Sequence, residues 1–486
     1  MSPAAKRLCG LIADLPDAEL HGDGRVQIAA VRYDSRLLQA GDLFVAVRGY
    51  ATDGHRYIRE AIARGAIAVV HQESWDPAIQ ATHVQVTSSR KALAVISSSF
   101  FDHPERDLRL IGVTGTNGKS TTAYMLWSIF QNAMPPAGMI GTIENRIGNE
   151  PLPAIHTTPE SLDLQKLFDR MRRERVQVVA MEVSSHALAL DRVYGLDFSA
   201  AIFTNLSHEH LDFHHTIAEY RDAKSLLFKS LSNTATAVLN DDDPVSDNYK
   251  RQTEARVRTY SLKNPKADLY GHEVETDWDG TRVTVRTPEG GMRFETPLVG
   301  SFNASNLLAA VGAALALDVP LEDIRQGLST LQSVPGRFER VPLDVPYTVI
   351  VDYAHTPDAL DNCLRTARSM PGERLITVFG CGGDRDRKKR PVMGKIAQNL
   401  SDVIVITSDN PRSEEPESII EDITAELSGD RPFIVEVDRR KAICKALAEA
   451  RPGDVVVIAG KGHESYQQIR DRKEPFDDRQ VVAECL

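Results

Sequence analysis

The sequence predicts an α/β protein of three domains, and three observations lead to this fold class. Its 486 residues suit about three domains, and its 42% hydrophobic and 26% charged content is that of an ordinary globular protein. Patterns typical of strands and helices alternate along most of the chain. Two proline-containing segments, Phe101–Arg106 and Ser333–Gly336, interrupt this alternation. We therefore expect domains at 1–105, 106–334 and 335–486.

The first region, 1–105, is expected to be a small α/β domain. Strands are predicted at Val26–Tyr33, Asp42–Val47 and Ala66–Val70, with a helix at Tyr57–Ala63. Asp34-Ser35-Arg36 follows the first strand, a common place for ligand contacts. A solvated turn explains this tripeptide equally well.

The central region opens with a phosphate-binding pattern. An apolar strand at Leu108–Val113 leads into a glycine-rich turn, and Lys119-Ser120 then begins a helix. Backbone N–H groups of such a turn cradle phosphates, the lysine reaches the terminal phosphates, and the serine hydroxyl holds Mg²⁺. The first glycine of the general pattern is displaced from position 113 to Gly112. Strand, turn, Lys-Ser and helix nevertheless follow in the required order and predict a nucleoside triphosphate site.

Two later strands of this region end in polar residues. The run Val176–Met181 ends at Glu182, which is a candidate second Mg²⁺ ligand or a helix-capping acid. The strand Ser199–Phe203 leads to a histidine cluster. His208-Glu209 begins the zinc-protease pattern His-Glu-x-x-His, but Asp212 stands at its closing position, so that motif fails. His210 could still contact a Mg²⁺-bound group or be structural.

The rest of the central region completes a mainly parallel sheet. A strand is predicted at Ala235–Leu239, and short alternating segments over 265–300 indicate a β-rich insertion. A helix from about Asn303 carries the longest apolar run, Leu307–Leu317, which is about half the length of a membrane span.

The last region resembles a dinucleotide-type doubly wound sheet, that is, a Rossmann-like domain. Gly380-Cys381-Gly382-Gly383 follows a strand, but Arg385 breaks the G-x-G-x-x-G frame, so NAD binding is not inferred. The dense basic cluster at 385–390 is either a solvated surface or a place for anionic ligands. The predicted elements are strands Tyr347–Val351, Leu375–Phe379, Val403–Thr407 and Val455–Ile458, and helices Asp358–Ser369 and Ile419–Leu427.

Charge and cysteine usage narrow the function classes. The net charge of −11 argues against broad nucleic-acid binding. Five scattered cysteines without a Cys-x-x-Cys pair argue against a disulfide framework or a cysteine zinc site and suit a reducing cytosol. No segment indicates a signal peptide or a membrane span. We expect a cytoplasmic monomer.

Together the motifs resemble the Mur ligases, the ATP-dependent amide-bond ligases of peptidoglycan synthesis. Gly115-Thr116-Asn117-Gly118-Lys119-Ser120-Thr121 is similar to the family's ATP loop, including the displaced glycine. Asp409-Asn410-Pro411-Arg412 resembles the signature of the member that adds meso-diaminopimelate to UDP-N-acetylmuramoyl-L-alanyl-D-glutamate. The resemblance spans the chain: it implies a first domain that binds the uridine nucleotide, a central ATPase domain and a C-terminal domain that brings the amino acid.

The resemblance also implies roles for individual residues. Catalysis and Mg²⁺ binding fall to Lys119, Ser120, Glu182, His210 and Lys224, the last as a carbamate. Beyond the loop 115–121, ATP contacts fall to Asn303, Asn306, Arg337 and Asp352. Contacts to the UDP-linked substrate fall to Tyr33, Ser35, His156, Thr157, Thr158, Ser184 and Arg192; His156 replaces the usual asparagine, and Leu190 stands where a glutamine is common. Contacts to diaminopimelate fall to Arg385, Asp409, Asn410, Pro411, Arg412, Gly460 and Glu464.

The implied reaction proceeds through an acyl phosphate. The glutamate carboxylate of the substrate attacks the γ-phosphate of ATP, and an amine of diaminopimelate then displaces phosphate. Three alternatives remain. Folylpolyglutamate synthase, a sibling, should lack the first domain and the Asp-Asn-Pro-Arg signature. A P-loop NTPase or kinase would hydrolyse ATP without a UDP-linked acceptor, and a nucleotide-sensing module would bind ATP without turnover.

Overall fold

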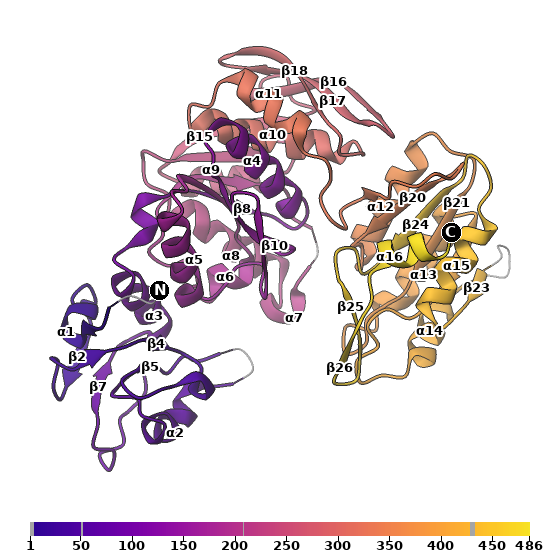
Figure 1. The fold of residues 1–486 in the computed structure, drawn as a ribbon. Helices are drawn as coiled ribbons and strands as arrows, with labels where there is room; N and C mark the ends of the chain where they lie inside the picture. Colours follow the sequence, from indigo (N-terminus) through magenta and orange to yellow (C-terminus); the bar gives the residue numbers. More distant parts are fainter. Residues whose placement is uncertain (1–3, 50–51, 208, 428–432) are drawn as a thin grey trace.

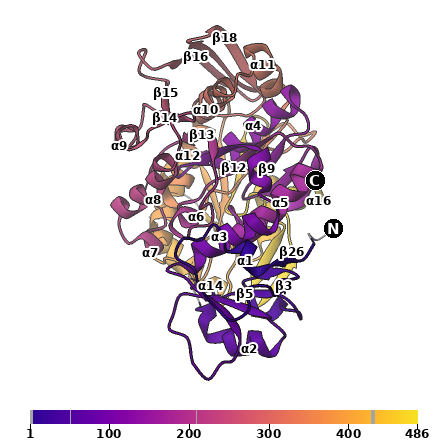
Figure 2. The same cartoon turned by 90° about the vertical axis from the view of Figure 1, so that its left-hand side faces the viewer.

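Each of the three expected regions contains a β-sheet of its own in the computed structural model, which describes residues 4–49, 52–207, 209–427 and 433–486. The lobes follow one another in the chain, and the central and C-terminal lobes face each other (Figure 1). The three-domain α/β class predicted from the sequence is confirmed. In a second view, α3 (Ser89–Phe100) of the first lobe lies beside α5 (Ser161–Arg173) of the central lobe (Figure 2).

The first lobe has a five-stranded sheet in the order β2-β7-β6-β5-β4. The single strand predicted at Val26–Tyr33 is wrong in detail, because the chain changes partners near Ala29. β3 pairs with β1 in a separate two-stranded sheet, whereas β4 joins β5 in the main sheet. The elements are β1 Lys6–Arg7, α1 Leu8–Leu11, β2 Glu19–His21, β3 Gln27–Ile28, β4 Val31–Arg32, η1 Ser35–Leu37, β5 Leu43–Val45, η2 Gly54–Tyr57, α2 Ile58–Ala63, β6 Ala68–His71, β7 Thr82–Gln85 and η3 Pro104–Asp107.

The central lobe is built on an eleven-stranded sheet in which β8 lies between β12 and β13. These three strands are parallel, so their carboxyl ends meet at one edge. The elements are β8 Arg109–Thr114, α4 Lys119–Ala133, β9 Gly138–Ile140, β10 Glu144–Ile147, β11 Glu150–Pro153, β12 Val178–Glu182, α6 Ser185–Ala189, β13 Phe198–Phe203, α7 Leu211–His214, α8 Ile217–Lys229, β14 Thr236–Asn240, α9 Ser246–Gln252 and β15 Arg256–Ser261.

The segment expected to be a β-rich insertion belongs to this same sheet. β16 (Leu269–Asp277) pairs with β15, and β17 (Gly280–Thr287) and β18 (Gly290–Thr296) extend the sheet in antiparallel fashion. α10 (Phe302–Ala316) carries the apolar run and buries most of its side chains in the core beside α4, with α11 (Leu321–Thr330) packed next to them. Among the described helices, none is long and apolar enough to cross a bilayer.

The C-terminal lobe has a six-stranded sheet in the order β19-β20-β24-β21-β22-β23, of which only β19 is antiparallel to its neighbour. This arrangement is the Rossmann-like sheet predicted from the sequence. The elements are β19 Glu339–Arg340, β20 Thr348–Asp352, α12 Pro357–Ser369, β21 Leu375–Phe379, α13 Lys389–Leu400, β22 Val403–Ile406, α14 Pro416–Thr424, β23 Phe433–Val435, α15 Arg439–Glu449, β24 Val455–Ala459, β25 Tyr466–Ile469, β26 Arg472–Pro475 and α16 Asp478–Glu484.

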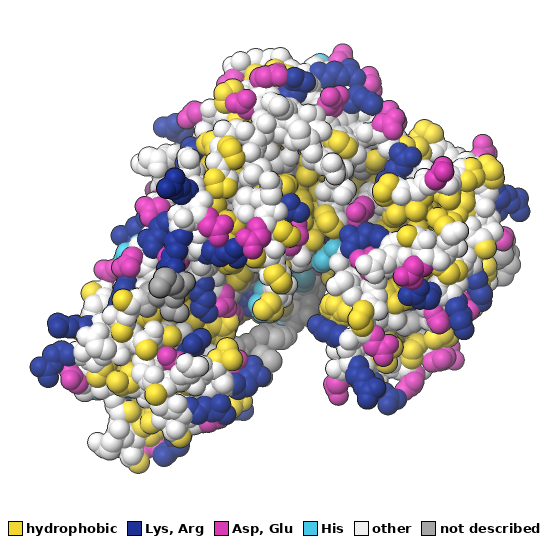
Figure 3. Space-filling model, in the orientation of Figure 1, with side chains coloured by type: hydrophobic (Ala, Val, Ile, Leu, Met, Phe, Trp, Pro, Cys, Tyr) yellow, Lys and Arg dark blue, Asp and Glu magenta, His cyan; other side chains and the backbone are white. Residues whose placement is uncertain are grey.

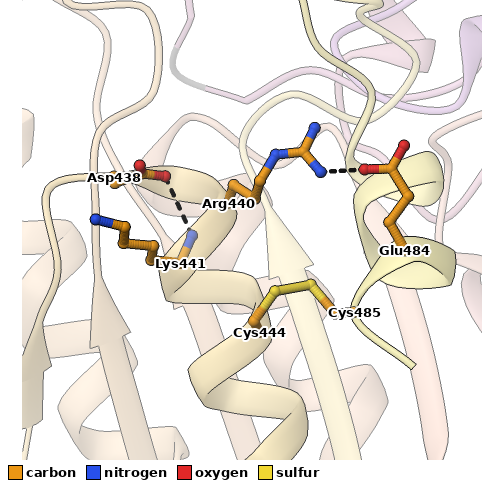
Figure 4. The surroundings of a disulfide bond; sticks show 6 residues. All are labelled: Asp438, Arg440, Lys441, Cys444, Glu484 and Cys485. Carbon is orange, nitrogen blue, oxygen red and sulfur yellow. Dashed lines mark hydrogen bonds and ion pairs between the residues drawn. A yellow bond between two sulfur atoms is a disulfide. The ribbon is translucent and has the colours of Figure 1, made fainter.

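A disulfide joins Cys444 of α15 to Cys485 at the end of α16 (Figure 4). The scattered cysteines argue against a disulfide framework, and one pair does not make a framework, but the sequence pattern does not reveal this pair. Its two members are 41 residues apart in sequence, and only the packing of α16 on α15 brings them together. Cys9, Cys363 and Cys381 are free.

Candidate active site

A cavity of about 1,200 Å³ lies between the central and C-terminal lobes. Residues of the turn after β8 line one wall, and residues that follow β20 line the opposite wall. Histidine side chains gather in the hollow between the two lobes (Figure 3), and His156, His186, His210 and His355 are among the lining residues. The cavity therefore combines groups from two domains.

The turn after β8 has the backbone expected of a phosphate loop. Gly115 and Gly118 adopt φ of +150° and +87°, and α4 begins at Lys119. A Cβ at Gly115 would collide with the Thr204 hydroxyl, and one at Gly118 would collide with the Asn306 carboxamide. Glycine is thus required both for the conformation and for the close approach.

Lys119 and Lys224 converge on one carbonyl of this turn. Lys119 Nζ donates to the oxygens of Gly115 (3.0 Å) and Thr116 (2.7 Å), and Lys224 Nζ donates to that of Gly115 (2.9 Å). Burial lowers the pKa of both amines. For Lys224, which is 1% exposed, repulsion from Lys119 lowers the pKa further. Burial and mutual repulsion therefore disfavour charging both amines at once, while the nearby Glu209 and Glu182 favour the charged form of Lys119.

Glu182 ends β12, directly beside the loop that follows β8. Its carboxylate accepts hydrogen bonds from the Ser120 hydroxyl (3.1 Å), from the Thr142 backbone N–H (2.8 Å) and from the Thr142 hydroxyl (3.1 Å). The carboxylate is thus fixed beside Ser120 rather than capping a helix. A carboxylate and a hydroxyl are the hard oxygen ligands that Mg²⁺ prefers.

The histidine cluster contributes an acid that sequence reasoning passed over. Glu209 is partly buried, and although desolvation alone would raise its pKa, Lys119 and His210 lower it, so the carboxylate is ionised. His210 lines the cavity with its Nε2 3.6 Å from Glu209. His208 and the side chain of Asp212 lie outside the described residues. Glu209 follows β13 and could have been recognised by the strand-edge argument used for Glu182.

The residues predicted to meet the rest of ATP lie near the loop or across the cavity. Asn306 donates to Asn303 (3.1 Å), and Arg337 Nη2 donates to the Ser120 hydroxyl (3.2 Å) from beyond the domain junction. Asp352 accepts from the N–H groups of Phe338 (2.6 Å) and Ala354 (2.8 Å), and burial raises its pKa.

The junction between the two lobes packs closely against a loop of the C-terminal lobe. Gly336 has φ of +66°, and a Cβ there would collide with the backbone of Gly462 and His463. The Arg337 guanidinium lies over the Tyr353 ring, 5.0 Å from its centroid.

The residues predicted to hold the UDP-linked substrate fall into two groups. His156, Thr157, Thr158, Ser184 and Arg192 line the cavity, as does Leu190. Arg192 pairs with Glu160 (2.9 Å) and donates to the Thr158 carbonyl (2.9 Å). Tyr33 and Ser35 lie in the first lobe, outside the lining; the Tyr33 hydroxyl donates to Asp163 of α5 (2.7 Å).

The residues predicted to hold diaminopimelate cluster at the carboxyl edge of the C-terminal sheet, away from the cavity lining. Asn410 donates to Glu464 (2.8 Å), and Lys461, which sequence reasoning missed, bridges Asn410 (3.1 Å) and Glu464 (3.0 Å). Arg412 has φ of +51° and donates to the Gly383 carbonyl (2.7 Å) rather than to a neighbouring acid.

The basic cluster at 385–390 proves to be partly structural. Arg390 is fully buried and pairs with Glu414 and Asp422 (both 2.8 Å), and Arg387 also pairs with Asp422. Arg385 is exposed and lies near Arg412: a Cβ at Gly382 would stand 4.0 Å from Arg385 Cγ and 2.9 Å from Arg412 Nη1. Arg385 therefore lies beside the other residues that are predicted to contact diaminopimelate.

A phosphate loop of one domain that faces residues of a second domain across a cavity is the arrangement expected of a two-domain, nucleotide-dependent enzyme such as a ligase. Comparison with known proteins agrees: the Mur ligase middle domain matches residues 113–314, the Mur ligase glutamate ligase domain 336–462, and the Mur ligase catalytic domain 27–101. The chain belongs to the Mur ligase family, whose members are ATP-dependent amide-bond ligases.

Its relatives extend over the full chain. The UDP-N-acetylmuramoyl-L-alanyl-D-glutamate–2,6-diaminopimelate ligase of Geobacillus thermodenitrificans (strain NG80-2) is 46% identical over 487 residues, 99% of each chain. A solved structure of a ligase of that name is 32% identical, with a TM-score of 0.72 over 99% of this chain and 98% of the other. Folylpolyglutamate synthase of Mycobacterium tuberculosis shares the fold over 76% of this chain and 92% of its own, at 19% identity and a TM-score of 0.64.

Proposed function

We propose that this protein joins meso-2,6-diaminopimelate to UDP-N-acetylmuramoyl-L-alanyl-D-glutamate at the expense of ATP. The products are the UDP-linked tripeptide, ADP and phosphate, and the role is in peptidoglycan synthesis and hence in cell-wall formation, cell shape and division. The observation that carries the proposal is the gathering of Asp409–Arg412, Gly460 and Glu464 at one sheet edge. Full-length relatives named as ligases of that activity, at 44–46% identity, support it.

The chain's own residues support an acyl-phosphate route. Lys119 and the loop N–H groups would hold the β- and γ-phosphates, while the substrate carboxylate attacks the γ-phosphate. The adjoining lining group of His156, Thr157, Thr158, Ser184 and Arg192 would orient the UDP-linked substrate. The two walls of the cavity belong to different domains, so closing them would exclude water before the acyl phosphate forms.

We also propose that Ser120, Glu182, His210 and a carbamylated Lys224 hold Mg²⁺, which would neutralise phosphate charge. The oxygens of Ser120 and Glu182 fit the ion, whereas an ammonium does not. The lowered pKa of Lys224 favours the neutral amine, the form that adds CO₂, and the carbamate so formed would supply oxygen ligands.

The proposed setting is the cytoplasm, with the enzyme acting as a monomer on small molecules and binding neither nucleic acid nor membrane. The net charge of −11 supports the exclusion of nucleic acid. Sedimentation of the purified enzyme with and without substrates tests the monomer.

Phosphate release tests the function. The purified enzyme is given ATP, the UDP-muramoyl dipeptide and one of a panel of amino acids, including meso-diaminopimelate, L-lysine and L-glutamate. Release that requires both the dipeptide and diaminopimelate is expected. Release without an acceptor would favour an NTPase or kinase, and ATP binding without turnover would favour a sensing module. Use of a folate acceptor would favour the sibling ligase, which the first lobe and the Asp409–Arg412 motif argue against.

A further inference from the structure

A buried ion pair lies next to the loops that follow β22 and β24 in the C-terminal lobe. Arg439, at the start of α15, and Asp478, at the start of α16, are both 0% exposed. Their contact is bidentate: Nε meets Oδ1 and Nη2 meets Oδ2, each at 2.8 Å. Two parallel charge-assisted hydrogen bonds fix the orientation of the guanidinium as well as its position.

The same guanidinium reaches the loops that follow two strands. Arg439 Nη2 donates to the Ala459 carbonyl (3.0 Å), and Nη1 donates more weakly to the Ser408 carbonyl (3.4 Å). These carbonyls immediately precede Gly460 and Asp409 of the proposed amino-acid site. One side chain therefore connects the loop after β22 to the loop after β24.

The charge of Arg439 also faces this site. Gly460, with φ of +118°, lies between the Asp409 carboxylate and the guanidinium: a Cβ there would collide with Asp409 Oδ2 and lie 3.9 Å from Arg439 Nη2. Within the described part of the chain, Oδ2 of Asp409 has no hydrogen-bond partner although the residue is buried. The other oxygen, Oδ1, accepts from the Asn410 N–H (2.6 Å), so it is the buried Oδ2 that depends on a nearby positive charge or on a ligand.

The second half of the pair is held by the C-terminal helix. Val481 and Val482 of α16 are buried, and the Cys444–Cys485 disulfide and the Arg440–Glu484 ion pair join α16 to α15 (Figure 4). The position of Asp478 is thus fixed by contacts remote from the amino-acid site.

We propose that Arg439 is a positioning residue for the amino-acid substrate, held in place by Asp478 of the C-terminal helix. It sets the spacing of the two strand-end loops and the orientation of Asp409 without touching the substrate. This inference rests on the proposed function, because it takes the Asp409–Arg412 and Gly460 loops as the amino-acid site.

Steady-state kinetics of Arg439→Lys and Asp478→Asn test the role. Lysine keeps the charge but cannot make the bidentate contact and both carbonyl contacts together. We expect each variant to raise KM for diaminopimelate about 10-fold or more, with KM for ATP and for the UDP-linked substrate within about twofold of wild type. The matched control is Arg440→Gln, which removes the exposed ion pair between the same two helices and should leave all three constants unchanged.

An ordinary structural role gives a different result. If both variants lower Tm but leave KM for diaminopimelate unchanged, or raise all three KM values equally, the positioning role is refuted. Should Arg439→Lys not fold, Asp478→Asn decides by the same criterion, because it preserves side-chain volume and a hydrogen-bond acceptor. Absence of diaminopimelate-dependent turnover in the wild type would instead refute the proposed function.

Discussion

The phosphate loop after β8 and the loops after β22 and β24 each follow the carboxyl ends of parallel strands in a mixed sheet, but the two sites are built from different groups. The phosphate loop relies on the main chain: it has two glycines at positive φ, and the carbonyl of Gly115 accepts hydrogen bonds from two lysine side chains. The C-terminal loops rely on side chains, with Asn410, Glu464 and Lys461 bonded to one another.

The phosphate loop and the C-terminal loops also differ in how their charged groups are paired. The Lys119 ammonium hydrogen-bonds to neutral carbonyls of the loop, so its charge is available to attract an anion, whereas Lys224 beside it is favoured as a neutral amine. In the C-terminal cluster, Lys461 already pairs with Glu464. The first site is therefore completed electrostatically by its ligand, whereas the second is ordered before its ligand arrives. Substitutions in the two sites should accordingly affect different kinetic constants.

The largest expected effect is on amino-acid choice. Diaminopimelate carries a distal carboxylate that lysine lacks, and a guanidinium such as that of Arg412 can bind it through two hydrogen bonds. We expect wild type to prefer meso-diaminopimelate to L-lysine by roughly 10³-fold in kcat/KM. Arg412→Ala should lose most of this preference through a higher KM for diaminopimelate, with ATP and UDP-substrate constants little changed.

The control for Arg412→Ala is Arg470→Ala, an exposed arginine whose backbone N–H bonds to the Arg412 carbonyl. It should retain the preference. Equal use of L-lysine by the wild-type enzyme would remove the basis for assigning Arg412 to the amino acid.

Lys119→Ala should affect the chemical step. The loss of an ammonium aimed at the β- and γ-phosphates costs about 10²-fold or more in kcat. The fold should survive, because the Gly115 carbonyl still accepts from Lys224. Phosphate release together with thermal unfolding measures both. Near-normal turnover in a folded variant would be incompatible with a phosphate loop at this position.

Lys224 should be needed as a carbamate rather than as a cation. ¹³C-bicarbonate should give a carbamate signal in NMR spectra of wild type that is absent from Lys224→Ala and Lys224→Arg, and both variants should lose most of their activity, about 10-fold or more. Arginine keeps the positive charge, so an active Lys224→Arg would show that charge alone suffices.

The lowered pKa of Lys224 gives this prediction a pH dependence. Only the neutral amine adds CO₂, and burial together with Lys119 favours that form in the folded protein. Carbamylation, and with it activity at limiting bicarbonate, should therefore fall as the pH falls through the lowered pKa. At pH values above that pKa, where the amine is neutral, added bicarbonate should raise the activity that limiting bicarbonate has reduced. A carbamate signal that does not change with pH would contradict the assignment.

The smallest expected effect concerns Thr142, which bonds to Glu182 through its hydroxyl and its backbone N–H. Thr142→Val keeps the backbone contact but removes the hydroxyl, which bonds both to Glu182 and to the Thr157 hydroxyl (3.0 Å). Loss of the Glu182 contact, worth about 1 kcal/mol, should lower kcat about fivefold. Thr142→Ser keeps the hydroxyl and is the matched control. Equal activity of the two variants would show that the backbone contact alone fixes Glu182.

The same contrast explains what the sequence could predict. The phosphate loop could be recognised because glycine, lysine and serine occur at fixed spacing, and the strand before it could be predicted from the apolar run Leu108–Val113. Glu182 was found because it ends a strand. The prediction of one continuous strand at Val26–Tyr33 is wrong because the chain changes its pairing partner within this segment, and the residue pattern does not indicate such a change.

The side-chain network around the proposed amino-acid site could not be predicted from the sequence pattern. Lys461, Arg439 and Asp478 lie on separate loops and helices, and only the folded sheet brings them to the loop after β22. The Cys444–Cys485 pair was missed for the same reason, since a separation of 41 residues carries no local pattern. Contacts between residues far apart in the sequence could be inferred here only from resemblance to a family or from the structure.

The close contact of Gly336 with Gly462 and His463 limits how far this enzyme can be treated as modular. The junction between the lobes packs against the loop that carries Lys461 and Glu464, so the connector and the amino-acid site form one packed unit. A chimera that borrows the C-terminal domain of another ligase should therefore take residues 334–337 from the same donor. Crossing over after Arg337 would join a connector from one parent to a loop from the other, so the breakpoint should lie upstream of Gly336.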